Sequence, residues 1–222
     1  MKKNMIMLAA LLIGLCGCGA NKAEETPAPV EEKTAETAEQ TEETADAEKK
    51  ALLVYFSRAG ENWEVGVVEK GNTRIAAEYI AETCGADTFE IVPVNPYPSD
   101  YMETVNIADE EKKSGARPEI SDTVTDWESY DTIILGYPIW HGDLPMIVYN
   151  FLESYDFSGK MVYPFVTHGG SGLAGTPERI RSTAAGADVK DGLALTGKTI
   201  QNDFDSVKAD IDTWLADNGL VK

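Results

Sequence analysis

Cysteine, histidine and basic residues are all scarce in this chain of 222 residues. The sequence holds 3 cysteines and 2 histidines, and no acids or thiols accompany the histidines at the spacing of a metal site. Basic residues number 19 against 38 acidic ones, which gives a net charge of −19. Such a surface repels nucleic acid and anionic lipid. We therefore expect neither a metal centre nor nucleic-acid binding.

Long apolar runs are also missing. The apolar run 5–15 is too short to cross a bilayer stably. It follows Lys2 and Lys3 and precedes small residues, which is the pattern of a secretory signal. Its end, Leu15-Cys16-Gly17-Cys18, resembles the lipobox of bacterial lipoproteins. The resemblance implies a signal peptide at 1–17 and lipidation of Cys18; the alternative is a plain signal peptide with cysteines there by chance.

Residues 18–50 are rich in Ala, Glu, Thr and Pro and contain one large apolar residue, Val30. Such a segment cannot bury enough surface to offset the chain entropy lost on folding. We therefore predict a disordered acidic tether that holds a lipidated protein at the outer face of the bacterial cytoplasmic membrane. Once Cys16 is removed and Cys18 is acylated, only Cys84 remains, which excludes an internal disulfide.

Residues 51–222 are long enough for one domain with a sizeable core. Residues 1–50 hold six lysines and ten acids, so this domain carries −15 of the net charge. Strand-like segments alternate with helical patterns; they span 51–56, 88–92, 132–137, 161–166 and 189–195. The alternation predicts an α/β fold, an open doubly wound parallel sheet of five strands with helices on both faces. Ligands of such sheets bind beyond the carboxyl ends of the strands.

The loop after the first strand has the build of an anion site. The strand breaks at Ser57, and a helical pattern opens at Gly71-Asn72-Thr73. Unpaired N–H groups and the helix dipole at such a start hold a phosphate. Ser57, Asn72 and Thr73 can add side-chain donors. The alternative is an ordinary strand–loop–helix connection with a capped helix.

Two further loops are expected at the same edge of the sheet. They read Pro138-Ile139-Trp140-His141-Gly142-Asp143 and Thr167-His168-Gly169-Gly170-Ser171-Gly172. A tryptophan beside glycine, and small residues that admit close backbone approach, suit a flat aromatic ring system. The alternative for Trp140 is a core position. His141 and His168 could lie near such a ring and shift its electron affinity or accept protons; the alternative for at least one of them is a solvated loop position.

Together, the three loops resemble those of the flavodoxin-like family that binds FMN. The resemblance covers 51–222 and implies a strand order of 2-1-3-4-5, noncovalent FMN and a redox function. It implies a phosphate site made by Ser57, Ala59, Asn72 and Thr73. It implies one ring-flanking loop with Pro138, Ile139, Trp140, His141 and Gly142, and a second with Thr167, Gly169, Gly170 and Gly172.

The insertion 61–70, which includes Trp63, departs from the compact phosphate loop of short flavodoxins. It either folds over the cofactor or binds a substrate. Three functions stay open at this point. The first is an electron carrier, whose acidic surface would steer a redox protein with a basic contact face. The second is an FMN-dependent reductase of quinones or other small acceptors, and the third is a lipoprotein that binds a ligand or partner without redox chemistry.

The lipobox generates a prediction about Cys18. The variant Cys18→Ser should appear in the soluble fraction or keep its signal peptide, because stable anchoring needs two or more acyl chains. Cell fractionation and the mass of the mature N-terminus measure this. A variant that is processed and retained on the membrane like the parent would show that lipidation at Cys18 is not the anchor.

Overall fold

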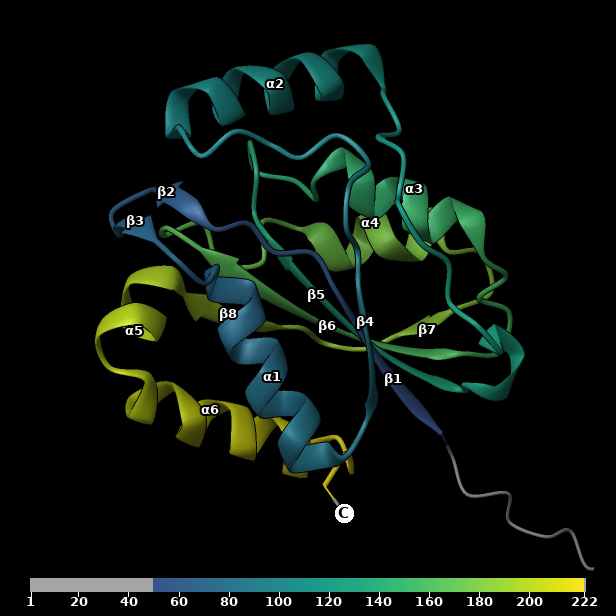
Figure 1. The fold of residues 1–222 in the computed structure, drawn as a ribbon. Helices are drawn as coiled ribbons and strands as arrows, with labels where there is room; N and C mark the ends of the chain where they lie inside the picture. Colours follow the sequence, from purple (N-terminus) through teal and green to yellow (C-terminus); the bar gives the residue numbers. More distant parts are fainter. Residues whose placement is uncertain (1–49, 222) are drawn as a thin grey trace, which may run out of the picture. The chain divides into compact units, whose positions relative to one another are not determined.

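The computed structural model describes residues 50–221, and the predicted signal peptide, Cys18 and the tether up to residue 49 lie outside them. A central sheet of parallel strands has helices on both faces (Figure 1). Its strands are β1 (Ala51–Tyr55), β4 (Asp87–Glu90), β5 (Thr132–Pro138), β6 (Met161–His168), β7 (Asp188–Val189) and β8 (Leu193–Thr196). The order is β4-β1-β5-β6-β7, and β8 also pairs with β6. The predicted fold class and strand order are thereby confirmed.

The predicted fifth strand is divided into β7 and β8, and both pair in parallel with β6. Lys190 N donates to Val162 O (2.9 Å), so the backbone N–H and C=O groups of Val162 point toward the β7 side of β6. The backbone groups of every second residue in a strand point toward the same neighbouring strand, so the backbone nitrogen of Pro164 also points toward β7 and β8. Because proline has no N–H to donate, the ladder is interrupted there.

The two faces of the sheet bury separate apolar clusters. Val54, Ile133 and Leu135 face a cluster that includes Phe151 of α3 (Met146–Ser154). Neighbouring strand residues such as Ile134 belong to the other cluster, which α1 (Asn72–Cys84) and α6 (Phe204–Asp217) cover. Alternate residues point to opposite faces, so the continuous apolar runs of the central strands supply both clusters. The short helices are α4 (Thr176–Thr183), α5 (Gly197–Asn202) and the 3-10 turn η1 (Trp127–Ser129).

Two elements lie at the carboxyl edge of the sheet rather than on its faces. The insertion forms an antiparallel hairpin, β2 (Gly60–Asn62) and β3 (Gly66–Val68). Beside it lies α2 (Tyr101–Ser114) (Figure 1), which starts where Asp100 Oδ1 accepts from Glu103 N (2.8 Å). Only Thr104 and Ala108 of α2 are buried, so this helix covers loops instead of the core. Between residues 50 and 221 no helix is both long and apolar enough to span a bilayer.

Candidate functional site

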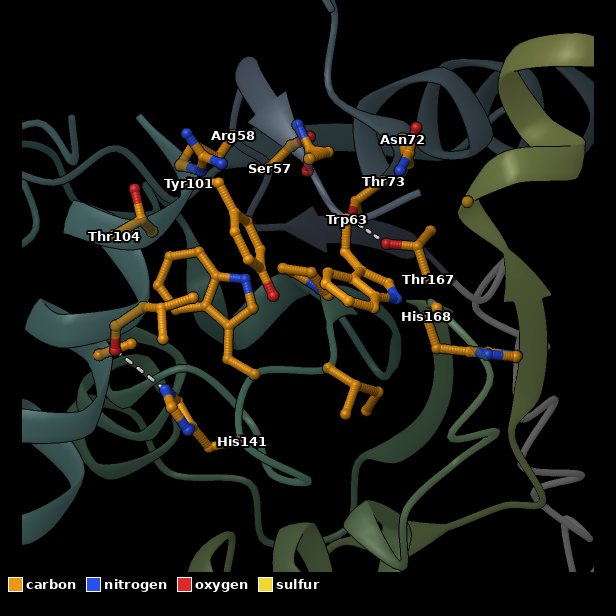
Figure 2. Close-up of a pocket in the computed structure, with 18 residues that line it drawn as sticks. Ser57, Arg58, Trp63, Asn72, Thr73, Tyr101, Thr104, His141, Thr167 and His168 are labelled. Carbon is orange, nitrogen blue, oxygen red and sulfur yellow. Dashed lines mark hydrogen bonds between the residues drawn. The ribbon is translucent and has the colours of Figure 1, made fainter. Parts of the chain in front are cut away.

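A cavity of about 300 Å³ opens at the carboxyl edge of the sheet (Figure 2). Nine residues of the predicted site line it, namely Ser57, Asn72, Thr73, Pro138, Ile139, Trp140, His141, Thr167 and Gly169. The predicted residues Ala59, Gly142, Gly170 and Gly172 lie outside this lining. The lining also includes residues that the sequence did not single out for the site, namely Arg58, Asn62, Trp63, Tyr101, Thr104, Val105, Ala108, His168 and Gly197.

One end of the cavity is the start of α1. The N-cap is Gly71, and Ile75 N donates to Gly71 O (3.2 Å), which is the first bond of the helix. Arg74 N donates to Ser57 Oγ (3.0 Å). The N–H groups of Asn72 and Thr73 precede these bonds and belong to the unpaired set that every helix start presents. The hydroxyl hydrogen of Ser57 is also left for a ligand, because its oxygen acts here as an acceptor.

Gly71 allows the loop after β1 to lie directly on the helix. A Cβ atom at this position would approach Ser57 Oγ to 2.3 Å and Arg58 O to 2.5 Å. Contacts this short with backbone exclude any side chain without a shift of the loop. The glycine therefore fixes Ser57 against the first turn of α1.

A buried hydroxyl pair joins α1 to the end of β6. Thr73 Oγ1 and Thr167 Oγ1 are 2.8 Å apart, and the two residues are 1% and 3% exposed. The pair has two hydroxyl hydrogens and consumes one in its own bond. The second hydrogen remains for an acceptor in the cavity.

A side chain of α5 orients the side-chain amide of Asn72 by a hydrogen bond. Gln201 Nε2 donates to Asn72 Oδ1 (2.8 Å) and to Lys70 O (3.0 Å). A Cβ atom on Gly197 would lie 2.4 Å from Asn72 Nδ2. The Asn72 side chain is thus oriented with its oxygen engaged, which leaves the Nδ2 group as a donor.

Arg58 supplies a positive charge to the wall of the cavity. Its Nη1 donates to Pro98 O (2.8 Å), and its Nη2 donates to Glu61 O. The Nε atom of Arg58 is buried and has no hydrogen-bond partner within residues 50–221. Burial lowers the pKa of Arg58, yet a guanidinium stays protonated in proteins. Arg58 therefore adds positive potential beside the start of α1.

The loop after β5 is a tight turn that presents Trp140. Trp140 N donates to Asp143 O (3.0 Å), and Asp143 N donates to Trp140 O (2.9 Å). The central residues His141 and Gly142 have φ of 49° and 67°, which is the pattern of a type I′ turn. Trp140 packs edge-on against Phe56, with ring centroids 5.3 Å apart, and also lines the cavity. It therefore combines features of both predicted alternatives.

Asp143 anchors this turn to two helices. It is 8% exposed, and its carboxylate lies 3.1 Å from Lys112 Nζ of α2 and 3.3 Å from Arg179 Nε of α4. Tyr149 OH donates to the same carboxylate (2.9 Å). Burial, assisted by Asp143, raises the pKa of Tyr149, so its hydroxyl stays a donor at neutral pH. Lys112 also donates to His141 O (3.0 Å), which clamps the turn under α2.

The loop after β6 brings backbone to the cavity. Gly170 N donates to His168 Nδ1 (2.9 Å). Burial lowers the pKa of His168, so the neutral ring with its hydrogen on Nε2 is the form at pH 7. The imidazole folds back on its own loop, and Gly169 is left to face the hairpin.

The insertion was expected to fold over the cofactor or to bind a substrate, and Asn62 and Trp63 of its hairpin do line the cavity. A contribution of α2 to the wall of the site was not predicted. The polar stretch 99–115 has a weak helical pattern in the sequence, and Asp100 and Gly115 mark the two ends of α2 within it. The position of α2 over the edge depends on long-range contacts such as that between Lys112 and Asp143. Within the insertion, the sequence does not distinguish Trp63 as the aromatic residue that lines the cavity.

Comparisons with known proteins agree with this geometry. A family model described as Flavodoxin matches residues 50–214. A solved protein from Bacteroides eggerthii DSM 20697, provisionally named a flavoprotein, is 30% identical, with a TM-score of 0.56 and coverage of 72% of this chain and 98% of that chain. A flavoprotein from Lactobacillus acidophilus NCFM, solved in complex with FMN, is 25% identical, with a TM-score of 0.52 and coverage of 71% and 99%. No curated protein matches significantly.

The strand order, the three loops at one sheet edge and the family match all concern the same segment. The match spans most of the chain and nearly all of the described residues. The chain belongs to the flavodoxin family.

Proposed function

We propose that residues 51–222 form an FMN-dependent redox domain that acts in electron transfer. The observation that carries this proposal is the cavity itself, which joins the start of α1 to the turn that presents Trp140. Membership of the flavodoxin family supports FMN as the cofactor. The FMN complex of the Lactobacillus acidophilus flavoprotein supports it further.

The chemistry of the lining fits both ends of FMN. The N–H groups at the start of α1, the Ser57 hydroxyl and the Thr73–Thr167 pair are donors suited to a phosphate. Trp140 and Ile139 supply apolar surface for the ring system. When bound, FMN supplies the electron exchange, while the protein binds and orients it.

The electrostatics favour exchange with a basic redox protein. The domain carries −15 of the net charge. Exposed acids flank two residues of the cavity wall, with Glu64 next to Trp63, and Asp100 next to Tyr101. A negative rim of this kind attracts a positive partner and accelerates encounter.

A second candidate is a reductase of quinones or other small acceptors. The observation that favours it is the wall built by α2 and the hairpin, which encloses the cavity more than a sheet edge would alone. A small acceptor needs such a pocket to be placed against the ring. An electron carrier needs only contact between its redox partner and an edge of the flavin ring.

The location is part of the proposal. The lipobox-like ending at Cys18 and the acidic segment 18–50 support a lipid-anchored protein at the outer face of the bacterial cytoplasmic membrane. In that position the segment would act as a tether for the redox domain.

The phosphate end predicts a preference for FMN over riboflavin. The variant Ser57→Ala should bind FMN about tenfold more weakly, because a hydrogen bond to a charged group contributes roughly 1.5–3 kcal/mol. Its affinity for riboflavin, which lacks the phosphate, should stay unchanged. Titration of the apoprotein with each flavin, followed by fluorescence, measures both dissociation constants.

Thr83→Ala is the matched control for this experiment. Its hydroxyl bonds Tyr79 O at the far end of α1 (2.9 Å), so neither dissociation constant should change. Equal affinity of the parent for FMN and riboflavin would contradict the placement of the phosphate at Ser57. An unaltered FMN affinity in Ser57→Ala would do the same.

The acidic rim predicts a salt-dependent electron carrier. Electron transfer to a basic cytochrome should slow about tenfold or more as ionic strength rises, because screening removes the attraction. Glu103 is a further exposed acid in the first turn of α2, two residues after Tyr101. The double variant Glu64→Gln/Glu103→Gln should slow electron transfer at low salt, whereas Glu82→Gln, on the far part of α1, should not. Stopped-flow mixing at several salt concentrations provides the rates. Fast NAD(P)H-dependent quinone turnover together with salt-independent cytochrome reduction would favour the reductase instead.

A further inference from the structure

Trp63 is a large aromatic residue with an unusual degree of exposure. It sits in the turn between β2 and β3 and is 59% exposed, although it lines the cavity. Tryptophan is highly buried on average in folded proteins. An indole that lines a cavity and keeps much of its surface uncovered is available for contact with a ligand in that cavity.

The indole has a defined seat. A Cβ atom on Gly169 would lie 2.6 Å from Trp63 Cδ1, so the absence of a side chain on Gly169 makes room for the ring. On another side lies Tyr101 of α2, with ring centroids 5.8 Å apart and planes tilted by 36°. Figure 2 shows the indole between Tyr101 and Thr167, directed into the cavity. Two different parts of the chain therefore define the position of Trp63.

The hairpin that carries Trp63 is fastened to the start of α2. Glu61 N donates to Ser99 O (2.8 Å), and Tyr101 N donates to Glu61 Oε2 (3.2 Å). Arg58 donates to carbonyls on both sides of this junction, at Glu61 and Pro98. The turn is closed by a bond from Val65 N to Asn62 O (3.2 Å). Such bonds hold Trp63 at the cavity even though the indole itself is exposed.

The loop after β6 has no large aromatic side chain of its own to place at the side of the cavity where Trp63 lies. Its sequence from Thr167 to Gly172 contains no phenylalanine, tyrosine or tryptophan. Its His168 ring is bonded back to Gly170 N. Trp140 lies in the loop after β5, and Trp63 rests on Gly169 in the loop after β6.

We propose that Trp63 is a second aromatic wall of the flavin site and stacks on the isoalloxazine ring, a role that the insertion supplies in place of the loop after β6. This inference rests on the proposed function. It assigns to the insertion a part in cofactor binding, with Tyr101 as its support. The isoalloxazine ring, on which Trp63 would stack, is common to FMN and riboflavin.

The test is the variant Trp63→Ala, with both flavins as probes. Both FMN and riboflavin should bind about tenfold more weakly, by the same factor, because the lost contact is with the shared ring. This pattern differs from that of a phosphate contact, which would affect FMN alone. Flavin bound to the variant should also be more fluorescent, since a stacked indole quenches the excited ring by electron donation.

Two further variants keep the test decisive. Trp63→Phe retains a flat ring and should recover most of the affinity. Val67→Ala alters a residue of the same hairpin that is 81% exposed and outside the cavity lining, and it should bind both flavins like the parent. Thermal unfolding of each apoprotein reports whether the fold is intact.

The outcomes separate the two proposals. If the parent binds FMN but Trp63→Ala binds both flavins equally well and with unchanged fluorescence, Trp63 is not a wall of the flavin site. The same conclusion follows if Val67→Ala weakens binding as much as Trp63→Ala, because the hairpin would then act as a whole. A parent protein that binds neither flavin overturns the proposed function, and this inference with it.

Discussion

The close approach of the loop after β1 to the first turn of α1 is the constraint on which the site depends. Gly71 leaves no room for a side chain between Ser57 Oγ and the helix, and Arg74 N binds that oxygen. This contact fixes the unpaired N–H groups relative to the Thr73–Thr167 pair at the end of β6. The loops after two strands are thereby joined around one cavity, because parallel strands end at the same edge.

The same contact explains how an acidic domain can hold an anionic cofactor. The domain carries −15 of the net charge, and Arg58 is the one lysine or arginine that lines the cavity within residues 50–221. Apart from this one guanidinium, binding of a phosphate relies on local hydrogen-bond donors and on the helix dipole, which acts over one turn of helix. The acidic exterior is then left to act on partners at longer range.

The sequence predicted the sheet and half of the residues that line the cavity, because both depend on local patterns. Continuous apolar runs at 132–137 and 161–166 indicate strands buried on both faces, and the loops that follow them lie at the cavity. The break between β7 and β8 depends on the side toward which Pro164 faces, which only the register defines. The position of α2 was beyond prediction, because a helix that buries only Thr104 and Ala108 has too small an apolar stripe to show where it packs. The contact of Trp63 with Gly169 is likewise invisible without the fold.

The central claim is that this cavity binds FMN without a covalent bond. The most direct measurement is the visible spectrum of the purified full-length protein, followed by mass analysis of the cofactor that denaturation releases. The account predicts a yellow protein with a flavin spectrum and release of intact FMN, about one per chain. A colourless protein that takes up no added FMN would contradict it, and so would a flavin that stays attached to the denatured chain.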